Sequence, residues 1–187
     1  MELALSWDLF IVSMFTIIVA YSFIIGLNKT IKTVIASYLG LLAADGLVNL
    51  IEKNILLNQK IQSGLEFIGY ASIGENLLFL KIFIFLLVVV ILTIRGNFVV
   101  GLTSKRFKLY NPFFTGLFGF LNASLILSTV LLYLSGNSIL EPTYSNTQIL
   151  DLYSNSYYVR ILVDYYSFWF SLPVLVMIIL SVWPEKE

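Results

Sequence analysis

The sequence predicts an all-α, polytopic helical membrane protein, because three observations agree. Of its 187 residues, 59% are hydrophobic and only 12% are charged, whereas a soluble domain has about 25% charged residues. The apolar residues form long continuous runs, not the alternating ten-residue strands of a membrane barrel. Lipid offers the backbone no hydrogen-bond partners, so each run is expected to form a helix of roughly 20 residues. We expect one integral membrane domain over residues 1–187, with four to five transmembrane helices and interfacial amphipathic helices.

Each predicted span ends at polar or helix-breaking residues. The first span ends at Gly26, the second at Glu52 and the third at Arg95. The fourth begins after Asn111-Pro112, a favourable helix start, and the fifth ends at Pro184. The first run has no preceding Lys or Arg, which favours a retained helix over a cleaved signal peptide. The expected spans cover about residues 7–27, 31–51, 77–94, 113–134 and 165–183.

Basic residues are distributed unevenly between the two expected sides of the membrane. Because Lys and Arg favour the cytoplasmic side, we expect the N-terminus outside and the C-terminus in the cytoplasm. This orientation requires an odd number of crossings, which five spans satisfy. The side richer in basic residues carries Lys29, Lys32, Arg95, Lys105, Arg106, Lys108 and Lys186, and the other side carries Lys53, Lys60, Lys81 and Arg160.

The two long outer connections are predicted to lie at the membrane interface. In the first, apolar residues recur at helical spacing and predict a short interfacial helix. In the second, seven tyrosines fall between Tyr133 and Tyr166, and such amphipathic rings favour the headgroup level. Contact with lipid headgroups is the expected role, and a partner-binding surface is the alternative. The apolar positions of the interfacial helix are Leu57, Ile61, Leu65 and Ile68.

Asp45 lies inside the second apolar run, where a charge costs about 2.5–3.5 kcal/mol on insertion scales. Lys81 lies near the outer end of the third run, at a similar expected depth. The sequence therefore predicts an intramembrane ion pair between Asp45 and Lys81. Two alternatives remain open: a neutral Asp45 hydrogen-bonded to a polar neighbour, or a carboxylate in a proton or ion pathway.

Small residues recur every four positions in two spans. Lipid gives no hydrophobic drive for helix association, so such stripes promote contact by letting backbones approach closely. We expect these stripes to pack within the chain, with self-association through one of them as the alternative. The predicted packing residues are Ala36, Gly40 and Ala44 in the second span, and Thr115, Gly116, Gly119, Asn122 and Ala123 in the fourth.

A basic juxtamembrane cluster follows the third span at Lys105, Arg106 and Lys108. It is predicted to be a cytoplasmic anchor, and binding of anionic lipid is the alternative. Eleven basic and eleven acidic residues leave no net positive charge, so no nucleic-acid partner is expected. The sequence has no Cys and no His, and no catalytic motif is evident. We expect no enzymatic activity and no cofactor; the expected partners are the lipid bilayer and either further copies of the chain or other membrane proteins.

Several features of residues 7–134 occur in a characteristic order. Asp8 heads the first span, Gly26 ends it, and a span rich in small residues follows. The segment at residues 111–120 (NPFFTGLFGF) then leads into the fourth span. This order resembles the colicin V production (CvpA) family of small bacterial inner-membrane proteins, although Asn122-Ala123 stands where that family tends to have Arg-Gly.

The resemblance implies a protein of the bacterial cytoplasmic (inner) membrane, linked to colicin V production and maintenance of the cell envelope. That family has no established enzymatic activity. The expected function is therefore a non-enzymatic scaffold or accessory subunit of a cell-envelope assembly. A channel or transporter component that uses Asp45 in a proton or ion pathway is the alternative.

Overall fold

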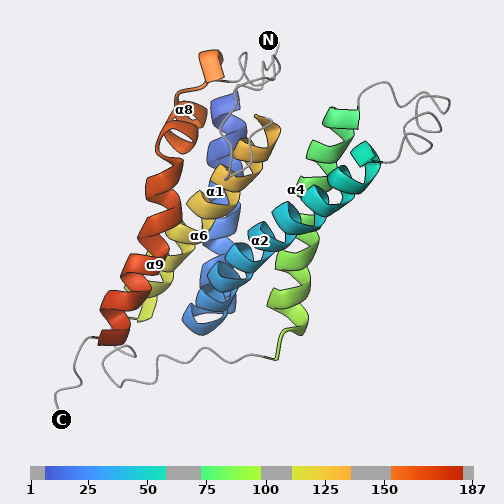
Figure 1. Cartoon of the computed structure of the whole chain (residues 1–187). Helices are drawn as coiled ribbons and strands as arrows, with labels where there is room; N and C mark the ends of the chain where they lie inside the picture. Colours follow the sequence, from blue (N-terminus) through green and yellow to red (C-terminus); the bar gives the residue numbers. More distant parts are fainter. Residues whose placement is uncertain (1–6, 58–72, 98–110, 136–152, 183–187) are drawn as a thin grey trace.

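The computed structural model describes residues 7–57, 73–97, 111–135 and 153–182, and these residues form helices without any strand. This confirms the predicted all-α class. Four helices are long and apolar enough to cross a membrane, and a bent pair of helices provides a fifth candidate crossing. The helices are α1 (Trp7–Ile25), α2 (Leu27–Leu57), α4 (Ile73–Arg95), α6 (Asn111–Leu134), α8 (Tyr157–Asp164) and α9 (Tyr166–Val182) (Figure 1).

Helix α6 is the centre of the bundle. Its apolar window is 72% buried, against 11% for α1 and 17% for α4. Helices α1, α2 and α9 pack on α6, whereas α4 packs mainly on α2 at the edge of the molecule (Figure 1). Helix α1 begins at one end of the bundle and α9 finishes at the opposite end (Figure 1). That arrangement fits an odd number of crossings.

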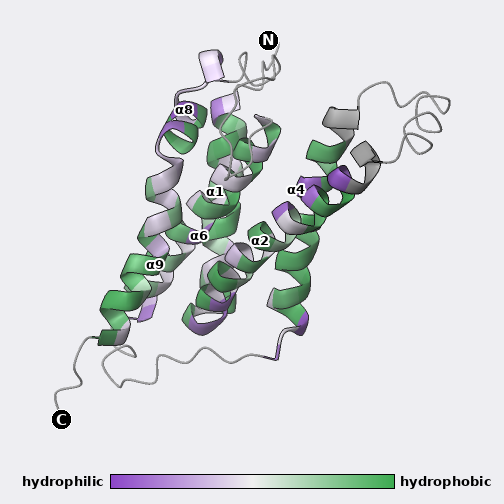
Figure 2. Ribbon diagram, in the orientation of Figure 1, coloured by the Kyte–Doolittle hydropathy of each residue, from purple (hydrophilic) through white to green (hydrophobic). Residues whose placement is uncertain are grey.

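The outer helices present large apolar side chains to their surroundings. Ile24 of α1, Ile94 of α4 and Val182 of α9 are each more than two-thirds exposed. Hydrophobic residues make up much of α1 and α4 and the C-terminal part of α9 (Figure 2). A soluble protein rarely exposes an apolar surface of this extent, whereas in a bilayer such a surface faces lipid tails. The chain is therefore a membrane protein.

A single glycine joins α1 to α2. Gly26 has φ +80°, a left-handed conformation that disfavours side chains with a Cβ. Thr30 strengthens the joint, because its hydroxyl donates to the carbonyl of Ser22 at 3.2 Å and to that of Gly26 at 2.9 Å. The polar residues Asn28 and Lys29, expected to form a connection, instead occupy the first turn of α2.

The predicted second span was consequently too short at both ends. Helix α2 extends over 31 residues, because polar residues at its ends continue the helical hydrogen bonding outside the apolar run. The third candidate span begins at Leu77, the expected residue, within a helix that begins at Ile73, and the fourth helix begins at Asn111, before the expected residue 113. Hydropathy marks where lipid contact ends, not where a helix ends.

The fifth predicted span is helical, but a bend of 64° at Tyr165 separates it from the preceding short helix. Helix α8 is amphipathic: it buries Val159, Leu162 and Val163 and exposes its polar side. Ser156 caps α8 by accepting a hydrogen bond from the Val159 backbone N–H at 3.2 Å.

Other predicted features fall outside the described residues. They include Ile61, Leu65 and Ile68 of the expected interfacial helix and much of the tyrosine-rich connection. Tyr133, however, is described and differs from the expectation for headgroup tyrosines, because it is fully buried among helices.

Candidate functional site

The structure brings Asp45 of α2 and Lys81 of α4 together. Lys81 Nζ lies 3.6 Å from Asp45 Oδ1, and each residue is only 7% exposed. Among the described charged residues, these two alone are buried. Their opposite charges therefore neutralise each other inside the bundle, in the arrangement expected for an intramembrane ion pair.

Two aromatic residues complete this group, which we term the Asp45 cluster (Asp45, Lys81, Phe85 and Tyr133). Tyr133 of α6 donates its hydroxyl hydrogen to the carbonyl of Leu41 at 3.2 Å, and its ring centroid lies 6.0 Å from Lys81 Nζ. That distance permits a cation–π interaction. Phe85 packs edge-to-face on Tyr133, with ring centroids 6.2 Å apart. The cluster thus joins α2, α4 and α6.

The chemistry available to the cluster is electrostatic. It contains a carboxylate, an ammonium and a phenol, and both charged residues are buried, so water does not fully solvate them. Within the described part of the chain, Asp45 Oδ1 accepts no hydrogen bond. A buried pair of this kind is costly to break, because either partner alone becomes an uncompensated charge. The cluster can therefore fix the position of α4 against α2.

Sequence reasoning did not find Tyr133 and Phe85. Tyr133 lies close to the end of an apolar run, which made it indistinguishable from an interfacial tyrosine. Its actual position depends on how α6 crosses α2. One usable signal was present: Phe85 follows Lys81 by four residues and so lies on the same face of its helix.

The small residues of α2 lie in the contact with α4 and α6. Ala36 and Ala44 are completely buried. A Cβ on Gly40 would lie 3.1 Å from the carbonyl oxygen of Phe85 and 3.0 Å from Cγ2 of Val89. The absence of a side chain at Gly40 therefore allows α2 and α4 to approach closely beside Phe85 of the Asp45 cluster.

The small residues of α6 lie mainly against α1. A Cβ on Gly119 would lie 2.8 Å from Ser22 Cβ, and one on Gly116 would lie 3.1 Å from the Phe23 ring. Asn122 lies at a different contact, where its side-chain oxygen accepts a 3.5 Å hydrogen bond from Ser37 of α2.

Both stripes are thus covered within the chain. Thr115 and Ala123 are also buried, and the Thr115 hydroxyl donates a hydrogen bond to the Asn111 carbonyl at 2.7 Å. This burial favours intrachain packing, because self-association through either stripe would require helices to separate first.

The predicted basic anchor, Lys105, Arg106 and Lys108, lies outside the described residues. Lys32, which is predicted to lie on the same cytoplasmic side, is described. Lys32 donates a hydrogen bond from Nζ to the carbonyl of Gly96 at 2.6 Å, which links the start of α2 to the end of α4.

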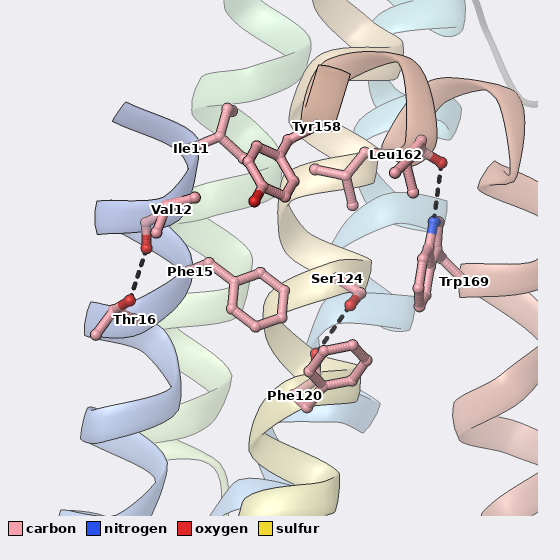
Figure 3. A pocket seen from close by; sticks show the side chains of 10 residues that line it. Ile11, Val12, Phe15, Thr16, Phe120, Ser124, Tyr158, Leu162 and Trp169 are labelled. Carbon is pink, nitrogen blue, oxygen red and sulfur yellow. Dashed lines mark hydrogen bonds between the residues drawn. The ribbon is translucent and has the colours of Figure 1, made fainter. Parts of the chain in front are cut away.

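A second feature is an apolar pocket between α1, α6, α8 and α9, with a volume of about 280 Å³ (Figure 3). Phe15, Phe120 and Trp169 form much of its wall. No sequence pattern predicted it, because it depends on the bend that places α8 over the space between α1 and α9. Neither Asp45 nor Lys81 lines it.

Comparisons with known proteins returned no match: no protein family, no curated protein and no solved structure corresponds to this chain. The likeness to the colicin V production family therefore stays a prediction from the order of sequence features.

Proposed function

We propose that this chain is a non-enzymatic integral membrane protein of the bacterial cytoplasmic membrane, serving as a scaffold or accessory subunit of a cell-envelope assembly. The observation that carries the proposal is the pairing of Asp45 with Lys81 inside the bundle. Charges that serve a permeation pathway face water or the permeating ion, whereas these two charges are enclosed by side chains and face each other.

The outer surface supports the same proposal. Helices α1, α4 and α9 direct large apolar residues outwards, so the surface available for binding faces sideways within the membrane. The interior of the bundle is occupied by α6 and its packing partners. Lipid and the helices of other membrane proteins are the partners suited to such a surface.

Native mass spectrometry of the protein, extracted in a mild detergent from its own membrane, tests the proposal. A scaffold or accessory subunit is expected to appear in a complex of fixed stoichiometry, either with other envelope proteins or with further copies of itself. A protein that remains a lone monomer under conditions that preserve other membrane complexes would contradict the proposal.

A second candidate function, a channel or transporter component, rests on one specific observation. Asp45 Oδ1 is buried and accepts no hydrogen bond from any described residue, and a proton or cation that bound this oxygen would compete with Lys81 Nζ, 3.6 Å away. The test is a proton-flux assay in proteoliposomes with the wild type and Asp45→Asn. Glu52→Gln, which removes a carboxylate near the end of the same helix, is the matched control.

The scaffold proposal predicts no flux above that of empty vesicles for all three proteins. Flux in the wild type and in Glu52→Gln that is lost in Asp45→Asn would instead establish the pathway and overturn the scaffold proposal.

A further inference from the structure

We propose that the pocket between α1, α6, α8 and α9 binds one hydrocarbon chain of a membrane lipid. The pocket is separate from the Asp45 cluster, so lipid binding there does not depend on the scaffold function. Its position, the hydrogen bonds of its polar groups and its size all favour a hydrocarbon ligand (Figure 3).

The pocket lies on the membrane-facing side of α6. Helices α1 and α9 both pack on α6, and the pocket occupies the space between them, with Phe120 and Ser124 of α6 among its lining residues. Tyr158 and Leu162 of α8 lie across one end (Figure 3).

The open side faces lipid tails. Val12 and Thr16 at the edge of the pocket are exposed residues of α1, a helix apolar enough to cross the membrane. They follow Trp7, the first residue of α1, by five and nine residues, which corresponds to roughly 8–14 Å along the helix axis. The edge of the pocket is therefore at a depth where hydrocarbon is the surrounding medium.

Most polar groups in the lining already have backbone partners. Thr16 donates to the Val12 carbonyl at 2.7 Å, and Ser124 donates to the Phe120 carbonyl at 3.0 Å. The Trp169 indole N–H donates to the Ile161 carbonyl at 3.2 Å (Figure 3). A polar ligand would find few free donors here, whereas a hydrocarbon chain leaves all these hydrogen bonds intact.

The size of the pocket favours a chain over a partner helix. An engineered apolar cavity of about 150 Å³ admits benzene, so a volume of 280 Å³ accommodates a longer segment of hydrocarbon. A transmembrane helix with its side chains is about 10–12 Å across, too wide for a pocket of this volume.

A row of edge-to-face rings gives the pocket a fixed shape. The ring centroids of Phe15 and Phe120 are 5.0 Å apart, and those of Phe120 and Trp169 are 6.0 Å apart. Such contacts hold aromatic rings in defined orientations. The wall therefore keeps the space open without a ligand having to rearrange it.

Trp169 supplies a reporter for the test. A variant in which Trp7→Phe and Trp183→Phe leave Trp169 as its one tryptophan is reconstituted into phosphatidylcholine vesicles with ordinary or brominated acyl chains. Bromine quenches an indole that it touches, so a chain in the pocket is expected to reduce Trp169 fluorescence by at least half. Unchanged fluorescence in brominated vesicles would overturn the proposal without any pocket variant.

Filling the mouth of the pocket separates a bound chain from surrounding lipid. Thr16→Phe, or Val12→Phe as a second variant, places a ring in the opening and is expected to abolish most of the quenching. Ile17→Phe is the control, because Ile17 is exposed on the same helix but does not line the pocket. Quenching that persists equally in folded Thr16→Phe, Val12→Phe and Ile17→Phe proteins would show that Trp169 contacts only surrounding lipid, and would overturn the proposal.

Discussion

Asp45 and Lys81 illustrate how the cost of a charge in lipid restricts where its partner can be. Each residue alone would be an expensive insertion, and depth along two antiparallel spans was enough to predict that they would meet. Their neighbour Tyr133 could not be predicted in the same way. Depth can be counted along one helix, but the face that α6 turns towards α2 is set by packing of the whole bundle.

Removing one partner of the ion pair is expected to destabilise the protein strongly. Asp45→Asn or Lys81→Met alone leaves a buried charge unpaired, which lowers the free energy of unfolding by about 3–5 kcal/mol. The double variant Asp45→Asn/Lys81→Met is expected to recover most of that loss. Unfolding by a denaturing detergent in mixed micelles measures the free energy of unfolding of the two single variants and the double variant.

Lys53→Met is the matched control for the ion-pair variants, because Lys53 is an exposed basic residue of α2. Its effect is expected to stay within about 0.5 kcal/mol. A double variant that is as unstable as the worse single variant would contradict the pairing of the two charges.

Substitution by alanine is expected to change the stability of the protein in opposite directions at two glycines. Gly119→Ala forces a Cβ to within 2.8 Å of Ser22 Cβ, so α1 and α6 must move apart, at a cost of about 1–3 kcal/mol. Gly46→Ala meets nothing within 4 Å and is expected to gain up to about 1 kcal/mol from helix propensity. The midpoints of thermal unfolding of the two variants are compared in the same detergent. Equal midpoints would contradict the close contact at Gly119.

At the scale of elements, the apolar runs predicted which segments form helices but not how the helices are joined. Gly26 was expected to end the first span, and it does so in a left-handed conformation. The bend at Tyr165 was not expected, since hydropathy records composition and carries no information about tertiary anchors. One such anchor is Ser156, which donates its hydroxyl hydrogen to the Asp8 carboxylate and so fastens the start of α8 to α1.

Loss of the Ser156 hydroxyl is expected to loosen α8. Ser156→Ala removes both the cap of the helix and the bond to Asp8, and so lowers the free energy of unfolding by about 0.5–2 kcal/mol. Ser167→Ala on the exposed face of α9 is the control and is expected to change it by less than about 0.5 kcal/mol. Hydrogen exchange of α8 amides adds a local measurement: exchange that is as slow in Ser156→Ala as in the wild type would contradict the anchoring role.

For the whole molecule, composition alone was sufficient to predict the class. Low charge and long apolar runs leave a helical membrane bundle as the stable solution, and the described helices have that form. The pocket beside α6 was beyond prediction, because it arises from the relative positions of four helices. The bias of Lys and Arg predicts which end of the bundle faces the cytoplasm.

The bundle is proposed to cross the membrane five times, with the bent pair α8–α9 as its last crossing, and single-cysteine labelling tests this topology. The chain has no native cysteine, so Asn28→Cys, Asn155→Cys and Val182→Cys each provide one labelling site. In intact cells, a membrane-impermeant maleimide is expected to label Asn155→Cys, and the other two only after permeabilisation. Labelling of Asn155→Cys and Val182→Cys from the same side would show that α8–α9 does not cross the membrane and would contradict the claim.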